Sequence, residues 1–247
     1  MTSIETECIV LRTYDLKEAD KIVVLFSREH GVVRGVAKGV KRLKSRFGSS
    51  LEPFSIIKAT YNGKESAELF NIERTDLIES NFAAASVPSS LETLTELTGF
   101  LLALSPPGDP NEALFRMVRR VLGAAVREPE KMELLALYFE VWLLRLTGFL
   151  PEFGRCSSCG RDFDDGTKAG LTSQMAVVCS NCGRIAPERE LSRSRRDIAA
   201  SAISQAPEAF AADNQHDVGD VVALSSFLVR MIGQSAGREL PGTGAPE

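Results

Sequence analysis

Four cysteines in the second half of the chain have the spacing of metal ligands. Cys156 and Cys159 form one C-x2-C-G knuckle, and Cys179 and Cys182, after nineteen intervening residues, form another. Two such turns supply the four sulfurs that suit tetrahedral zinc. Since four thiolates leave no coordination position for water or substrate, the spacing predicts one structural zinc ion. The alternatives are four unrelated thiols or redox activity, and a redox C-x2-C needs no second copy.

A second stretch has the composition of an anion-binding site. Residues 31–46, GVVRGVAKGVKRLKSR, carry six cations and no Asp or Glu, although the formal net charge of the chain is -4. A nucleic-acid backbone favours such a cluster because each Lys or Arg releases condensed counterions. The composition therefore favours nucleic-acid binding over a solvated basic turn. The residues expected to contact nucleic acid are Arg34, Lys38, Lys41, Arg42, Lys44 and Arg46.

The elements that must position the basic stretch are short strands. The first half of residues 31–46 reads as a curved strand in which glycines mark a bulge, a bend or a close backbone approach, and residues 40–46 read as a mobile basic loop. Five strands with turn signals between them favour a small barrel, either an OB-fold or an SH3-like barrel. The other expected strands cover residues 8–11, 21–27, 54–61 and 66–72.

From about residue 81 the pattern becomes helical. A capping-box spacing, Ser89 with Glu92, predicts the start of one helix, and Asp109 followed by Pro110 predicts the start of the next. A third helix is expected to begin at Pro129 and to end at a C′ glycine, Gly148. Trp142 and the leucine stripes are interpreted as core. A last amphipathic helix is marked by Val218, Val221, Val222, Ser225, Leu228 and Ile232.

The chain is therefore divided into five predicted parts. They are an OB-fold nucleic-acid-binding domain (1–80), a helical bundle (81–150), a four-cysteine zinc ribbon (151–188), the C-terminal helices of the helical domain (189–236) and a disordered tail (237–247).

Composition limits the class of protein. A hydrophobic content of 44% and a charged content of 25% are ordinary for a globular protein, and a pI near 5.5 requires any nucleic-acid site to be local. The sequence shows no apolar run long enough to span a bilayer and no signal peptide, so a reducing, cytoplasmic setting is expected. Cysteines there are thiols or metal ligands more often than disulfides, and Cys8 is expected to be a buried thiol.

Several segments resemble the bacterial recombination mediator family RecO. EADKIVVLFSREHG, RGVAKGVKRLKSRFG and LEPF are similar to its N-terminal signature. YFEVWLLRLTGFLPEFGRCSSCG is similar to the helix that leads into its ribbon, and VVCSNCG to the second half of the ribbon. The resemblance covers residues 5–185. Where similar proteins often have paired glycines, this chain has Gln174-Met175-Ala176, and some members lack the cysteines.

The resemblance implies an N-terminal OB-fold, a helical C-terminal domain with an inserted zinc ribbon, and no enzymatic turnover. It implies binding of single- and double-stranded DNA, strand annealing, and displacement of single-strand-binding protein (SSB) so that RecA can load. The implied partners are RecR and the acidic tail of SSB, with no membrane and no small-molecule substrate. The same six basic residues would contact DNA, and the SSB tail would dock around Arg116, Arg119 and Arg120.

Three other functions compete with this interpretation. A nuclease would need clustered carboxylates for a divalent metal, and Asp162, Asp164 and Asp165 form the tightest acidic group. An RNA-binding protein of the translation apparatus could combine an OB-fold with a zinc ribbon. A purely structural scaffold would show no salt-sensitive binding of nucleic acid.

Overall fold

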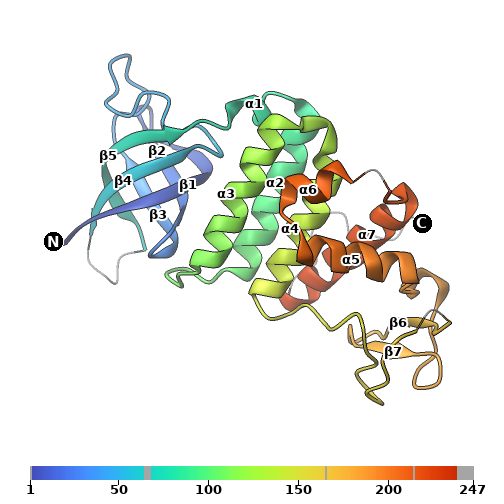
Figure 1. Ribbon diagram of the computed structural model, residues 1–247. Helices are drawn as coiled ribbons and strands as arrows, with labels where there is room; N and C mark the ends of the chain where they lie inside the picture. The colour runs from blue at the N-terminus through green and yellow to red at the C-terminus, as the bar shows by residue number, and fades with distance from the viewer. Residues whose placement is uncertain (1, 64–67, 165, 214, 238–247) are drawn as a thin grey trace. The chain divides into compact units, whose positions relative to one another are not determined.

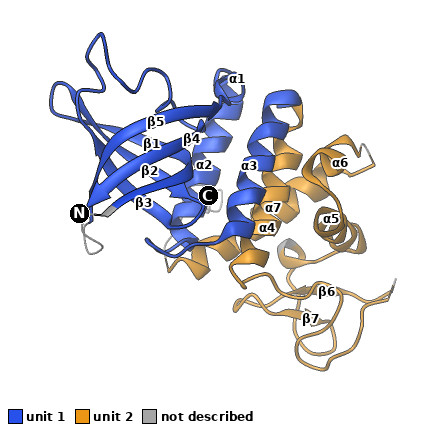
Figure 2. Ribbon diagram, turned by 60° about the vertical axis from the view of Figure 1, so that its left-hand side comes forward, with its two compact units in different colours: residues 1–129 blue, residues 130–247 orange. Residues whose placement is uncertain are grey.

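A computed structural model describes residues 2–63, 68–164, 166–213 and 215–237 of the chain. The chain divides into two compact units, Met1–Pro129 and Glu130–Glu247 (Figure 2). The first unit holds a β-barrel and three helices, and the second holds a helical bundle and a small two-stranded ribbon.

The first five strands close into a barrel (Figure 1). They pair in the order β1-β2-β3-β5-β4, and β4 pairs back onto β1. All pairs are antiparallel except β3 with β5. This confirms the expected five-stranded barrel, which is of the OB type. The strands are β1 (Thr2–Leu16), β2 (Asp20–Ser27), β3 (Gly31–Ala37), β4 (Ile56–Gly63) and β5 (Phe70–Glu79).

Alternating side chains fill the barrel interior, as period-two strands require. Cys8 is fully buried there, as expected, and burial raises the pKa of its thiol far above the usual value. The interior cluster comprises Cys8, Val10, Val23, Leu25, Val33, Ala37, Phe47, Leu51, Ile57, Ala59, Tyr61 and Ile72.

The fifth strand lies further along the chain than its sequence suggested. Of the expected residues 66–72, residues 66 and 67 lie outside the described residues, and β5 continues to Glu79. Residues 73–76 of β5 are polar, with exposed Glu73, Arg74 and Asp76, and they interrupt the apolar pattern before the exposed Leu77 and Ile78 near the end of the strand.

Three helices complete the first unit: α1 (Phe82–Ala85), α2 (Pro88–Leu104) and α3 (Glu112–Arg127). The predicted capping box is wrong, because α2 begins at Pro88, before Ser89, and has no side-chain cap. α3 starts later than the expected Asp109-Pro110, because its N-cap is Asn111. The Asn111 side chain accepts a hydrogen bond from the Leu114 N–H at 3.0 Å. An asparagine oxygen satisfies one of the N–H groups that a helix start leaves unpaired.

Gly31 brings the barrel against the segment between α2 and α3. It has φ +61°, and a methyl group placed on it would lie 2.2 Å from the Asp109 carbonyl oxygen. Phe26 of β2 and Phe115 of α3 also pack together, with ring centroids 5.9 Å apart. The close backbone approach expected of a glycine in this stretch is therefore present.

The second unit is built around a central helix, α4 (Met132–Leu146), which packs on α5, α6 and α7. Trp142 donates a hydrogen bond to the Ala202 carbonyl at 2.9 Å, so its interpretation as packing is confirmed. The other elements are 3-10 turns at Pro129–Lys131 (η1) and Pro187–Arg189 (η2), strands β6 (Ala169–Leu171) and β7 (Val177–Cys179), and helices α5 (Arg193–Ser204), α6 (Pro207–Ala212) and α7 (Val218–Ser235).

Helix ends in this unit match the sequence only in part. α4 ends as expected, because Gly148 has φ +81° and the Phe149 N–H donates to the Leu144 carbonyl at 2.8 Å, which closes a Schellman turn. The predicted last helix is α7, on which Val221, Leu228 and Ile232 are buried, whereas Val218 and Val222 are exposed. Among the helices in the described part of the chain, none is long and apolar enough to cross a membrane.

Candidate nucleic-acid interface and four-cysteine centre

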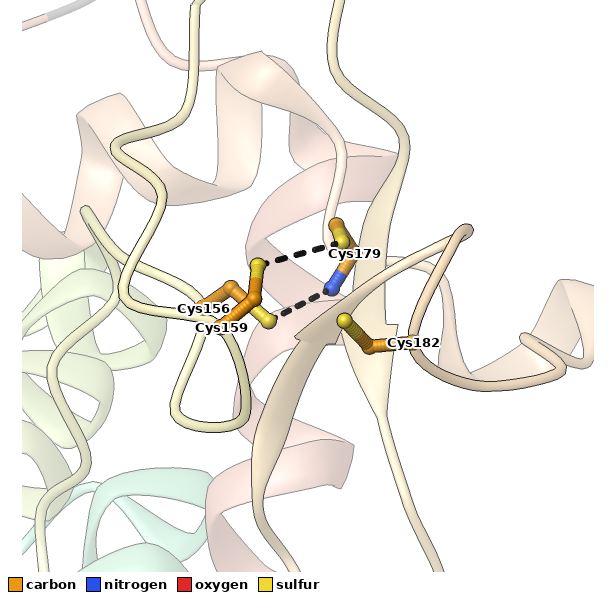
Figure 3. Close-up of side chains that lie close together, drawn as sticks. All are labelled: Cys156, Cys159, Cys179 and Cys182. Carbon is orange, nitrogen blue, oxygen red and sulfur yellow. Dashed lines mark hydrogen bonds between the residues drawn. The ribbon is translucent and has the colours of Figure 1, made fainter.

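Two tight turns present the four cysteines to one another (Figure 3). The Gly160 N–H donates to the Cys156 carbonyl at 2.9 Å, and the Cys182 N–H donates to the Cys179 carbonyl at the same distance. Cys179 ends β7, so the short hairpin β6–β7 positions the second turn. The spacing in the sequence thus becomes two knuckles that face each other.

The four sulfur atoms form a compact group. All lie within 4.8 Å of one another, and the sulfurs of Cys159 and Cys179 are 3.9 Å apart. A tetrahedron of thiolates at zinc–sulfur bonds of about 2.3 Å has sulfur–sulfur edges of about 3.8 Å. The group is therefore close to the size that a four-thiolate metal site requires, and it could hold a metal ion.

The pKa values of two thiols in this cluster are shifted in opposite directions. Burial opposes ionisation of Cys156, but N–H groups of Cys159, Cys179 and Ser158 outweigh it and lower the pKa to about 6. The nearby sulfurs of Cys159 and Cys179 raise the pKa of Cys182 to about 12. One thiolate thus forms readily, and a second negative charge beside it needs a cation to offset the repulsion.

The cluster rests on a small apolar base. Phe163 packs against Cys156, Val178 and Cys179, and the Arg196 guanidinium of α5 lies 5.2 Å above the Phe163 ring. This cation–π contact connects the ribbon to the helical part of its own unit.

The ribbon hairpin forms although paired glycines are missing. Met175 has φ +60°, a left-handed conformation that glycine adopts without strain. The Thr172 N–H donates to the Ala176 carbonyl at 3.0 Å, and the Met175 N–H donates to the Thr172 carbonyl at 3.1 Å. The turn is therefore closed by backbone hydrogen bonds, and Met175 keeps a strained backbone conformation.

The cationic loop, residues 38–46, is a succession of hydrogen-bonded turns. The Arg42 N–H donates to the Gly39 carbonyl at 3.1 Å, and the Ser45 N–H donates to the Arg42 carbonyl at 2.9 Å. Just beyond the loop, Phe47 and Leu51 insert into the barrel core. Buried anchors and local hydrogen bonds give the loop a defined path.

The structure separates the six candidate cations into two groups. Lys41 forms an ion pair with Asp15 at 2.8 Å, and Arg46 donates to the Ile72 carbonyl at 3.4 Å and lies over the Phe47 ring. All six are exposed, but among the residues that the structure describes the other four form neither an ion pair nor a side-chain hydrogen bond. These four are Arg34, Lys38, Arg42 and Lys44.

Three arginines of α3, expected near a partner site, have different surroundings. Arg119 lies 3.4 Å from Glu7 of β1 and 3.4 Å from Glu79 of β5, so it links the helix to the barrel. Arg116 and Arg120 are exposed. The charge of Arg119 is thus compensated within its own unit, and the charges of its two neighbours face solvent.

The aromatic residues that follow the cationic loop in the sequence are buried, so they are not exposed beside it for stacking. Phe47 and Phe54 are 2% and 3% exposed and belong to the interior. Tyr14 is 49% exposed and was missed by the sequence analysis. The exposure of Tyr14 could be found from the pairing of β1 with β2, because this pairing places the tyrosine on the outer face of the barrel, away from the core.

The acidic residues considered for a nuclease have structural partners. Asp162 forms an ion pair with Arg155 at 3.1 Å, and Asp164 accepts hydrogen bonds from Thr167 and the Gly166 N–H. Asp165 lies outside the described residues. Within the described ranges, the only group of three or more Cys, His, Asp or Glu residues arranged to hold a metal is the four-cysteine cluster.

The fold and the site define a two-unit protein that joins an OB-type barrel bearing a cationic loop to a helical unit bearing a four-cysteine cluster. Residues 1–81 match the family described as recombination protein O N terminal, and residues 94–230 match recombination protein O C terminal. The chain belongs to the RecO family of DNA repair and recombination proteins.

Relatives support this assignment. The DNA repair protein RecO of Koribacter versatilis is 37% identical over 197 residues, which cover 79% of this chain and 78% of the relative. The protein of the same name from Geobacter metallireducens is 33% identical over 193 residues, 74% of each chain. That of Rubrobacter xylanophilus is 31% identical over 180 residues, 72% of this chain and 71% of the relative.

Proposed function

We propose that this protein binds single- and double-stranded DNA through its barrel and anneals complementary strands. With RecR it would help to load RecA on SSB-coated DNA, without enzymatic turnover, in the cytoplasm and on the nucleoid. Membership of the RecO family supports the pathway. The single observation that carries DNA binding is the set of four exposed, unpaired cations, one on β3 and three in the cationic loop, of a net acidic chain.

The mechanism follows from this local charge. Two strands can pair only when their phosphates stop repelling each other and their bases remain accessible. Cations on a small barrel lower the repulsion without reading the sequence. The predicted contacts remain Arg34, Lys38, Lys41, Arg42, Lys44 and Arg46. If only the four uncompensated cations displace counterions, log K against log salt has a slope of about -3 to -4.

The four-cysteine cluster would hold one structural zinc ion, with Cys156, Cys159, Cys179 and Cys182 as its ligands. The sulfur spacing and the all-thiolate donor set support this assignment. Bound zinc supplies a cross-link between the two knuckles. Because all four positions are filled by sulfur, the residues of the ribbon have a stabilising role and not a chemical one.

The acidic tail of SSB would dock near Arg116 and Arg120, with Arg119 at the margin because Glu7 and Glu79 compensate it. Two exposed guanidinium groups one helical turn apart suit a carboxylate-rich peptide. This site and the cationic loop would serve different partners.

Annealing of complementary oligonucleotides, bare and SSB-coated, tests the proposal. Wild-type protein should accelerate both reactions. The double reversal Arg42→Glu/Lys44→Glu should remove most of the acceleration on bare strands at an unchanged melting temperature. The matched control Arg116→Glu/Arg120→Glu changes the net charge equally and should leave annealing of bare strands intact. Annealing by the loop variant at the wild-type rate would overturn the proposal, and stronger competition by RNA than by DNA would redirect it to RNA.

A further inference from the structure

We propose that the solvent-exposed end of the outer face of β1, β2 and β3 is a stacking platform for a base of single-stranded DNA, and that Tyr14 is the ring on which the base stacks. The inference rests on the proposed function and deepens it. It adds a base contact to a site that otherwise holds only phosphates.

Strand registry places the platform residues in one row. Tyr14 of β1 pairs with Ile22 of β2, and Ile22 pairs with Val36 of β3. Directly opposed residues of antiparallel strands share a face of the sheet. The next residues, Val23 and Ala37, belong to the interior cluster. Tyr14, Ile22 and Val36 therefore lie together on the outer face of the barrel.

The same outer face is covered at its other end. Phe26 packs against Phe115 of α3, and Val32 forms a bridge with Pro107. Between the two ends, Arg12 donates to the Thr95 carbonyl of α2 at 3.4 Å. Tyr14 lies past this cover and is 49% exposed. Ile22 and Val36 are half-buried beside it and form an apolar floor.

Unpaired cations flank this row. Arg34 precedes Val36 by two residues on β3 and so lies on the same outer face, and Lys38 is the first residue after the end of that strand. Both are exposed, and no carboxylate among the described residues compensates them. Two acids at this end have other partners, because Asp15 pairs with Lys41 and Asp20 accepts a hydrogen bond from the Gly39 N–H at 2.8 Å, and a third, Glu18, is exposed in the turn between β1 and β2.

This combination of groups fits one occupant. An exposed aromatic ring binds an unstacked base, and cations on either side bind the phosphates that flank it. Bases inside a duplex are already stacked and cannot use the ring. An acidic peptide would use the cations but gains little from the ring. The geometry therefore points to a single strand whose base is turned toward Tyr14.

Binding to two oligonucleotides of equal charge tests the platform. One is oligothymidylate, and the other is an abasic strand of the same length, both measured by fluorescence anisotropy at one salt concentration. Wild-type protein should prefer the base-bearing strand roughly 5- to 150-fold, the range of one stacked base. Tyr14→Ala should bring this preference near one at unchanged affinity for the abasic strand, and Tyr14→Phe should keep it.

A matched control removes another exposed aromatic ring. Phe82, 58% exposed, follows the end of β5 marked by Glu79, whereas the platform row reaches Asn71 near the start of that strand. Phe82→Ala should leave the preference unchanged. Cross-linking of a 5-iodouracil strand to the peptide that contains Tyr14 is the second measurement, and it decides the matter if Tyr14→Ala does not fold.

The outcomes separate the two proposals. Equal affinity of Tyr14→Ala and wild type for the base-bearing strand, or cross-links confined to other peptides, would overturn the platform and leave phosphate binding standing. A wild-type protein that binds neither strand would overturn DNA binding itself. Weakened binding of both strands by Tyr14→Ala, in equal proportion, would show that the ring supports the barrel and does not contact a base.

Discussion

The Lys41 ammonium group lies 2.8 Å from the Asp15 carboxylate, so one cation of the loop is held against β1. A hydrogen bond from Lys41, helped by its charge and that of Lys21, keeps the pKa of Asp15 below its usual value. The Asp15 carboxylate therefore remains ionised at neutral pH. An arriving phosphate must therefore compete with a carboxylate for this lysine.

Removal of this competitor should strengthen DNA binding. Asp15→Asn should raise affinity about two- to five-fold at low salt, the range of an exposed ion pair, and make the salt slope steeper by about one. Asp76→Asn is the control, because it removes an equal charge that pairs with Arg74 on β5. Equal gains in both variants, measured by salt titration, would mean that only the overall charge matters.

Gly31→Ala should destabilise the first unit strongly. The new methyl group would meet the Asp109 carbonyl oxygen at 2.2 Å and would force a left-handed φ on alanine. We expect a loss of about 3 kcal/mol or more in the free energy of unfolding. Gly48→Ala, also at positive φ but with nothing within 4 Å, should lose only about 1 kcal/mol. Equal losses in urea unfolding would contradict the close approach.

Met175→Gly should strengthen the ribbon. The left-handed conformation at φ +60° strains a methionine, and glycine relieves this by about 0.5 to 1 kcal/mol after its extra chain entropy is counted. Metal release to a chelator should slow accordingly. Met175→Ala removes the same side chain and keeps the strain, so it should not slow release. A slower release in the alanine variant alone would show that the side chain, and not φ, sets the rate.

Cys156→Ser should abolish stoichiometric metal binding. With only three thiolates the cluster loses affinity, and the melting temperature should fall because bound metal stabilises the folded ribbon. Cys8→Ala is the control, since this thiol is buried in the barrel core. That variant should keep about one zinc per chain by elemental analysis. A metal-free wild-type protein, purified without chelators, would refute the zinc site.

Substitutions of different arginines on α3 should affect either the stability of the first unit or the binding of a partner. Arg119→Ala breaks two contacts at 3.4 Å and leaves Glu7 and Glu79 less compensated, so the first unit should lose about 1 kcal/mol. Arg116→Ala/Arg120→Ala should leave the melting temperature unchanged and weaken an acidic peptide that models the SSB tail. If Arg119→Ala alone weakened the peptide, the site would lie elsewhere.

Local patterns in the sequence were enough to predict the barrel and the cysteine cluster. Short apolar runs between turn signals indicated most strands, and the C-x2-C-G spacing is a local pattern that can be recognised without knowledge of the fold. The end of β5 was not predicted because the polar residues 73–76 interrupt its apolar pattern, and the start of α2 was not predicted because Val87 makes no side-chain cap. The exposure of Tyr14 and the Asp15–Lys41 pair depend on the registry between strands, which spacing along one strand does not reveal.

The insertion of Phe47 and Leu51 into the barrel core has a calorimetric consequence. A charged arm that folds only on its ligand buries new apolar surface and shows a large negative heat-capacity change on association. Here the anchoring residues are already buried before any polyanion arrives. Association at the cationic loop should therefore have an enthalpy that changes little with temperature, and its speed should be set by electrostatic steering and not by an ordering step.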